Sequence, residues 1–138
     1  MFDSYPIYGP FGYSSANDTS SGIRRMTSGY SLRNISTRTT LPDGSTASVA
    51  GPNVNSSYPI GSFLWDYEWL STNGDLDVSN GRWCVTPEYP DGTYAYFTST
   101  DSTGAATYPF TIGSNYYGSV PVTGNTVTSI SASATTYF

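Results

Sequence analysis

Two carboxylates, Asp66 and Glu68, lie in the segment that is richest in tryptophan, residues 64–70 (LWDYEWL). Paired carboxylates perform acid–base catalysis in glycosidases without a histidine. Carboxylates among aromatic rings also suit sugar binding without hydrolysis, and the same pattern is typical of a half-exposed packing edge. We favour the packing edge and predict no catalytic residue. A glycosidase-like use of Asp66 or Glu68 is the third hypothesis for function.

The three tryptophans, Trp65, Trp69 and Trp83, are the candidate platform on which a sugar ring would stack. Aromatic rings offer a large apolar face together with a polar edge. Cys84 lies in apolar sequence between Trp83 and Val85, and we expect a buried, unreactive thiol there.

Asp75, Asp77 and Ser79 place oxygen atoms at alternate positions, as the first part of a calcium loop does. The rest differs from an EF-hand, because Gly81 stands at the seventh position instead of the sixth and Thr86 replaces the glutamate at the twelfth. We therefore expect a turn that Asp and Asn side chains stabilise. Binding of Ca²⁺ by these three residues is the alternative interpretation.

The composition excludes most other mechanisms. The 138 residues contain no His, no Lys and one Cys, which removes histidine bases, Schiff-base lysines and zinc–thiolate sites. All five cations are arginine against ten carboxylates, so we expect no nucleic-acid partner. No apolar run approaches the ~18 residues of a membrane span, so no membrane insertion is expected. No cofactor is predicted.

The elements that must position these residues are short strands. The chain holds 22 Ser, 19 Thr and 16% aromatic residues, which favours an all-β, sandwich-like domain of short antiparallel strands with long loops. Residues 64–70 form at most one short helix. Along the strand predicted at 93–99, Tyr94 and Tyr96 share one face, and the intervening side chains share the other. Strands are predicted over residues 23–33, 35–41, 45–49, 93–99 and 108–112, with turns at Asp43-Gly44, Asn73-Gly74, Asn80-Gly81 and Asp91-Gly92.

The last segment, residues 121–138, differs from the rest because Ile130, Ala132 and Ala134 alternate with Ser. This pattern predicts a β tail after a β domain at residues 1–120. The tail either closes the sheet of its own domain or pairs with a neighbouring subunit as an added strand.

Four stretches of sequence occur in a recognisable order: residues 5–12 (YPIYGPFG), 75–82 (DLDVSNGR), 93–97 (TYAYF) and 108–113 (YPFTIG). Together they resemble the motifs of the YHYH domain family, which occurs in secreted bacterial proteins and in structural proteins of tailed phages. The resemblance runs from about residue 3 to residue 118. It implies structural roles for Tyr5, Pro6, Tyr8, Gly9, Asp77, Asn80, Gly81, Tyr94 and Tyr96.

The departures from the family pattern concern its reactive residues. Ala95 and Phe97 stand where the family has the two histidines of its name, so any metal or redox role of those histidines is not available here. Ser79 and Ser114 stand where secreted members have cysteines. The resemblance implies that these two cysteines form a disulfide in those members, which would explain why both are replaced here. It also implies further strands before residues 5–12, either absent here or supplied by another chain.

The resemblance thus implies that the chain keeps the fold of the family but not its reactive histidines and cysteines. We expect a non-enzymatic structural or assembly module of a phage particle, most like cyanophage virion proteins, or of another extracellular assembly. Its expected partners are other copies of itself, other structural proteins and surface glycans. A carbohydrate-binding module is the second hypothesis. The first residues lack the charged and apolar regions of a signal peptide, so we expect either another export route or a processed chain or fragment.

Overall fold

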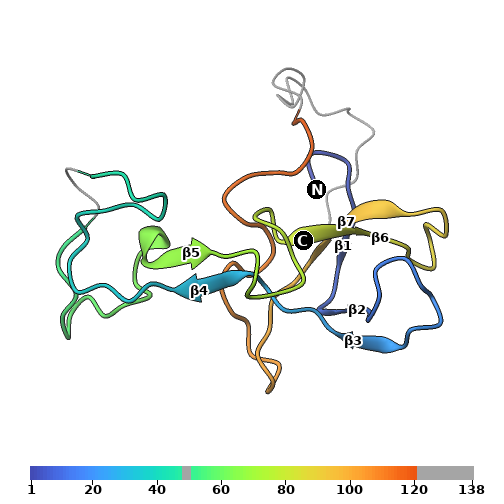
Figure 1. Ribbon diagram of the computed structural model, residues 1–138, viewed down its shortest axis with the longest axis horizontal. Coiled ribbons are helices and arrows are strands. Elements are labelled where there is room, and N and C mark those ends of the chain that lie inside the picture. Colours follow the sequence, from blue (N-terminus) through green and yellow to red (C-terminus); the bar gives the residue numbers. More distant parts are fainter. Residues whose placement is uncertain (48–50, 121–138) are drawn as a thin grey trace, which may run out of the picture.

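The computed structural model describes residues 1–47 and 51–120 of the 138-residue chain. Within these ranges the protein is all-β, as predicted, with seven short strands, one 3-10 turn and no α-helix (Figure 1). No helix in the same ranges is long and apolar enough to cross a membrane. The predicted β tail at 121–138 lies outside the described residues. The elements are β1 (Ile7–Tyr8), β2 (Phe11–Tyr13), β3 (Ile23–Arg25), β4 (Tyr30–Leu32), η1 (Leu64–Asp66), β5 (Tyr67–Trp69), β6 (Gly81–Cys84) and β7 (Thr93–Phe97).

Strand β7 organises the largest sheet, which has the strand order β1–β7–β6. It pairs with β6 in the antiparallel sense and with β1 in the parallel sense, so β1 departs from the predicted antiparallel arrangement. Every residue of β7 is buried. The predicted alternation is confirmed, because Ala95 and Phe97 enter the hydrophobic core while the hydroxyls of Tyr94 and Tyr96 reach carboxylates.

The hydrophobic core lies against the Ala95 face of β7 and is small. Because β7 is the central strand of this three-stranded sheet, both of its edges are paired, and its side chains are buried on both faces. The core cluster consists of Met26, Leu76, Cys84, Ala95 and Phe97, with Tyr8 and Ala16 packed against it.

Two antiparallel ribbons complete the described fold, β2–β3 and β4–β5. The β4–β5 ribbon and the described loops of residues 33–47 and 51–66 extend away from the three-stranded sheet (Figure 1). The single strand predicted over residues 23–33 is in fact two strands, β3 and β4. Between them the Thr27 N–H donates to the Asp75 carboxylate at 2.9 Å, and the Asp75 N–H donates back to the Thr27 carbonyl at 2.8 Å, so this backbone pairs with a loop.

Two other segments are less regular than predicted. Residues 64–70 are helical only in η1 and then extend as β5, which pairs with β4. The hairpin predicted over residues 35–49 is reduced, within its described part, to one bridge between Thr40 and Thr46. The Leu41 N–H donates to the Ser45 carbonyl at 2.8 Å beside this bridge, and the buried side chain of Arg38 in the same segment donates to the Pro52 and Pro59 carbonyls.

The strand predicted over residues 108–112 is wrong. The segment is a turn in which the Phe110 N–H donates to the Thr107 carbonyl at 2.7 Å, and Phe110 has a left-handed φ of 67°. The peptide bond between Tyr108 and Pro109 is cis. The turn places the ring of Tyr108 on that of Tyr67 in a stacked pair, with 4.0 Å between the ring centroids.

Candidate functional site

The buried tyrosines on one face of β7 donate hydrogen bonds to two carboxylates. The Tyr94 hydroxyl donates to both carboxylate oxygens of Asp77, at 2.8 and 3.0 Å. The Tyr96 hydroxyl donates to Oδ2 of Asp3 and accepts a hydrogen bond from the Tyr117 N–H at 2.7 Å. Burial raises the pKa of both hydroxyls, and the carboxylate that each one contacts raises it further. Both phenols are therefore protonated donors at neutral pH.

Asp3 ties the start of the described chain to residues 117–118. Its carboxylate, with the residue only 8% exposed, also accepts a hydrogen bond from the Gly118 N–H at 3.0 Å. Burial alone would raise the pKa of Asp3, but the hydrogen bonds from Tyr96 and Gly118 outweigh burial and the pKa is lowered. A buried negative charge is thus stabilised here by neutral donors.

Asp77 closes the turn that leads into β6. Its Oδ1 accepts a hydrogen bond from the Gly81 N–H at 3.2 Å. Asn80 is fully buried with a left-handed φ of 64°, and its amide donates to the Phe97 carbonyl at 2.7 Å. A Cβ atom at Gly81 would overlap the Tyr94 hydroxyl, so glycine is needed for this close approach.

Of the three candidate calcium ligands, Asp75 has a partner of its own, whereas Asp77 and Ser79 contact each other. The Asp75 carboxylate pairs with the Arg24 guanidinium at 2.6 and 2.7 Å. The Asp77 carboxylate accepts the Ser79 N–H at 2.9 Å, as in the predicted Asp-stabilised turn. Among residues 1–47 and 51–120, no group of three or more His, Cys, Asp or Glu side chains could hold a metal ion.

The opening motif supports β7 through its backbone and through the rings of Tyr5 and Tyr8, which pack on Tyr94 and Phe97. The Pro6 carbonyl accepts the Tyr96 N–H at 3.0 Å, and the Tyr8 carbonyl accepts the Thr98 N–H at 3.1 Å. Gly9 follows β1, and a Cβ atom there would meet no neighbour within 4 Å. The motif therefore supplies the parallel strand beside β7.

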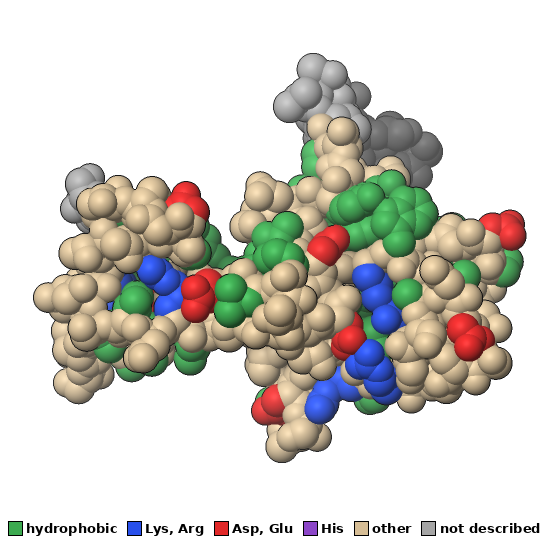
Figure 2. Space-filling model, in the orientation of Figure 1, with side chains coloured by type: hydrophobic (Ala, Val, Ile, Leu, Met, Phe, Trp, Pro, Cys, Tyr) green, Lys and Arg blue, Asp and Glu red, His purple; other side chains and the backbone are tan. Residues whose placement is uncertain are grey.

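Trp83, Tyr5 and Tyr117 form a surface that we call the aromatic patch. The Trp83 Nε1–H donates to the Tyr117 hydroxyl at 2.7 Å, and the Tyr5 ring packs edge-on against both other rings. Tyr117 also stacks on the buried Tyr94, with 3.7 Å between centroids. Trp83 is 54% exposed and Tyr117 44% exposed. A large cluster of hydrophobic side chains covers this end of the molecule, near β6 and β7 (Figure 2).

The other two tryptophans lie elsewhere. Trp65 and Trp69 line one cleft of about 340 Å³, and Glu68 lies in its wall. The Trp69 Nε1–H donates to the Leu76 carbonyl at 3.1 Å, while Trp65 is 42% exposed. The structure thus brings two of the three predicted platform residues together and places Trp83 in the aromatic patch.

The Asp66 carboxylate accepts hydrogen bonds from the loops that surround it. It is completely buried, and the Arg38 Nε and Nη2 donate to its two oxygens at 2.6 and 2.8 Å. The N–H groups of Gly61 and Phe63 donate to the same carboxylate. The Arg38 guanidinium lowers the pKa of Asp66. This carboxylate is ionised and inaccessible, which suits a structural role, whereas Glu68 is partly exposed.

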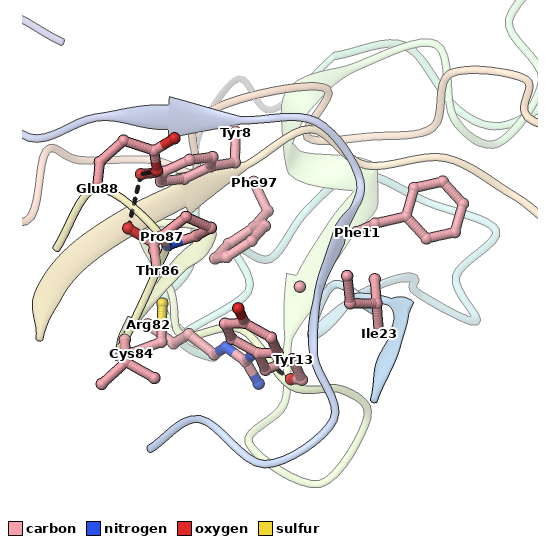
Figure 3. A pocket seen from close by; sticks show the side chains of 12 residues that line it. Tyr8, Phe11, Tyr13, Ile23, Arg82, Cys84, Thr86, Pro87, Glu88 and Phe97 are labelled. Atoms are coloured by element: carbon pink, nitrogen blue, oxygen red, sulfur yellow. Dashed lines mark hydrogen bonds between the residues drawn. The ribbon is translucent and has the colours of Figure 1, made fainter. Parts of the chain in front are cut away.

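An open pocket of about 280 Å³ lies on the core face of the β1–β7–β6 sheet (Figure 3). Phe97, Tyr8 and Arg82 line it together with Cys84, which is 2% exposed. Burial raises the pKa of the Cys84 thiol, although the nearby Arg82 partly offsets this effect. The predicted burial of this thiol is confirmed.

The fold and these contacts define a small all-β domain built around one buried, tyrosine-rich strand. The family model described as YHYH protein matches residues 1–109, and the chain belongs to this family. No curated protein and no solved structure is significantly similar to the chain. Ala95 and Phe97, which the sequence resemblance aligns with the family's two histidines, both lie in the buried core.

Sequence reasoning missed three residues that hold this arrangement together: Asp3, Arg38 and Tyr117. Asp3 directly precedes the first motif and Tyr117 closely follows the last one, which is the signal that could have drawn attention to them. Nothing in the local pattern around Arg38 indicates that its side chain is buried.

Proposed function

We propose that the chain is a non-enzymatic structural or assembly module that docks on other protein subunits through the aromatic patch. The assembly is extracellular, and a virion is the assembly that the sequence resemblance favours. The partner subunits are further copies of the chain or other structural proteins.

The observation that carries this proposal is the imbalance between buried and exposed apolar side chains. In the described ranges, seven hydrophobic residues are buried, whereas 14 large hydrophobic residues are exposed. Exposed apolar surface that is gathered in patches is typical of protein interaction sites. Tyrosine and tryptophan are enriched at such interfaces, and a charged fraction of only 11% leaves few charges to desolvate.

Sedimentation of the purified chain over a range of concentrations, combined with electron microscopy, tests this proposal. We expect oligomers, rings or fibres that Trp83→Ser weakens. Leu70→Ser is the matched control, because Leu70 is also exposed (43%) but lies outside the aromatic patch. A native chain that remains a monodisperse monomer, indistinguishable from Trp83→Ser, contradicts the proposal.

Carbohydrate binding is the second candidate, and one observation favours it. Trp65 and Trp69 line the same cleft, where tyrosine rings and the Glu68 carboxylate offer both stacking surfaces and a hydrogen-bond acceptor. Electrophoresis through gels that contain polysaccharide would show retardation of the native chain, reduced in Trp65→Ala and unchanged in Trp83→Ala. Equal mobility with and without polysaccharide would exclude this candidate for the glycans tested.

A further inference from the structure

The pocket on the core face of β7 is apolar along most of its wall. The rings of Phe11 and Phe97 and the side chain of Ile23 line it, and Phe11 and Ile23 are 60% and 70% exposed at their positions in β2 and β3. Arg82 contributes the pocket's single guanidinium (Figure 3). A volume of about 280 Å³ is close to the lower limit for small-molecule sites, so the pocket suits a ligand with one ring.

The guanidinium of Arg82 forms no salt bridge among the described residues, although it lies near enough to the Asp75 carboxylate to help lower the pKa of that group. Arg24 and Arg38 each form a salt bridge within the same ranges. Its Nη2 donates to the Tyr13 carbonyl at 2.5 Å. Its Nε is the one buried side-chain nitrogen or oxygen atom in the described ranges without a hydrogen-bond partner. Leaving such a donor unpaired costs about 1–3 kcal/mol, and more for charged groups, so an acceptor at this place would be stabilising.

We propose that this pocket binds a small aromatic monocarboxylate, with the carboxylate on Arg82 and the ring against Phe97 and Ile23. A carboxylate offers two acceptors to the planar fork of a guanidinium, which a neutral group cannot match in strength. The ring replaces water on apolar walls that are otherwise hydrated. This site lies apart from the aromatic patch, and the proposal does not depend on the assembly role.

Glu88 restricts the ligand to a single negative charge. Its carboxylate also lines the pocket, where the Tyr8 hydroxyl donates to it at 2.8 Å. Figure 3 shows Glu88 and the Arg82 guanidinium at different ends of the pocket, with the Phe97 ring between them. A dicarboxylate that spanned the pocket would place its second charge near Glu88, and this like-charge contact would weaken binding.

Titration of the full chain, followed by NMR of the backbone amides, tests the proposal with three probes: 3-phenylpropionate, the neutral 3-phenylpropionamide and acetate. We expect 3-phenylpropionate to shift the signals of Gly12 and Val85, which line the pocket. The amide, which lacks the charge, and acetate, which lacks the ring, should each bind at least about 10-fold more weakly.

Arg82→Met keeps an apolar stem and removes the guanidinium, so it should weaken binding of 3-phenylpropionate at least about 10-fold. Arg25→Met is the matched control, because the Arg25 guanidinium also donates to a carbonyl, that of Asp101, but lies outside this pocket. Its affinity should stay unchanged.

A second pair of variants leaves Arg82 in place. Ile23→Asp puts a negative charge at the exposed edge of the pocket, and Ile23→Asn puts a neutral side chain of the same size there. The aspartate variant should bind 3-phenylpropionate more weakly than the asparagine variant, and the two should bind 3-phenylpropionamide equally. Equal affinity of the native chain for acid and amide, undiminished binding by a folded Arg82→Met, or no binding of the acid would overturn the proposal.

Discussion

In the loops that follow β4, the guanidinium of Arg38 holds the buried carboxylate of Asp66; at the three-stranded sheet, the hydroxyl of Tyr96 holds the buried carboxylate of Asp3. Both carboxylates have a lowered pKa and are charged at neutral pH. The first is neutralised by a cation, whereas the second depends on neutral donors. The two regions should therefore respond differently to the loss of the partner and to pH.

The difference follows from what else each region can bury. The three-stranded sheet packs against the hydrophobic core, to which its residue Phe97 belongs. None of the five core residues comes from the described loops, residues 33–47 and 51–66. There the Arg38 side chain, which also donates to the Pro52 and Pro59 carbonyls at 2.5 and 3.1 Å, connects segments that share little apolar surface. The ion pair organises the loops, while the Tyr96 contact adds to a sheet that is already packed.

The largest effect is expected from Arg38→Met, which leaves the Asp66 charge buried without its cation. We expect a loss of about 3–5 kcal/mol in the free energy of unfolding, measured by urea denaturation. Adding Asp66→Asn removes the stranded charge while keeping an acceptor for the Gly61 and Phe63 N–H groups, so the double variant should recover part of the loss. Equal stability of the single and double variants would show that the buried charge is not what matters.

Tyr96→Phe should be milder, because it keeps the ring and removes a neutral hydroxyl, which donates to Asp3 and accepts the Tyr117 N–H. A hydrogen bond to a charged group contributes about 1.5–3 kcal/mol, so we expect a loss near 2 kcal/mol in urea denaturation. Tyr108→Phe is the control, since the Tyr108 hydroxyl contacts no hydrogen-bonding partner in the described ranges while its ring is stacked. If the two variants lose the same stability, the contact with Asp3 contributes nothing specific.

Alkaline pH should affect the stability of the two regions differently, because the Tyr96 phenol ionises and the Arg38 guanidinium does not. The pKa of Tyr96 is raised in the fold by burial and by Asp3, so its stabilising contribution is complete below the unfolded-state value of 10.0. Above that pH the unfolded chain ionises first, and stability falls by about 1.4 kcal/mol per pH unit for each such tyrosine. Urea denaturation between pH 8 and about pH 11 should therefore give a shallower pH dependence for Tyr96→Phe than for the native chain. Parallel curves would refute this assignment.

The smallest effect is expected from Arg24→Met. The Arg24–Asp75 pair has the same chemistry as Arg38–Asp66, but its side chains are 43% and 20% exposed. Pairs of this kind contribute roughly 0–1 kcal/mol and are screened by salt. We expect a loss below about 1 kcal/mol that vanishes in 1 M NaCl, again in urea denaturation. If Arg24→Met instead lost as much stability as Arg38→Met, at low and at high salt, burial would not explain why the two ion pairs differ.

The sequence by itself determined the features that depend on neighbouring residues. The all-β class follows from its strand-forming composition. The two faces of β7 follow from the period of two along a strand. The glycines of the predicted turns at Asp43-Gly44 and Asp91-Gly92 have positive φ, 83° and 97°. The prediction of at most one short helix in residues 64–70 is confirmed by η1, whereas the strand predicted at residues 108–112 is wrong, because partners elsewhere in the chain decide whether such a short segment pairs or turns.

Only the tertiary structure decided which distant residues meet. Tyr96 lies 93 positions from Asp3, and Asp66 lies 28 positions from Arg38. Periodicity reports which face a side chain occupies, but not what lies opposite that face. The separation of Trp83 from the Trp65–Trp69 cleft, and the meeting of Arg82 with apolar walls from β2 and β3, arise in the same way. They follow from the path of the chain through space, which brings together segments that no local pattern connects.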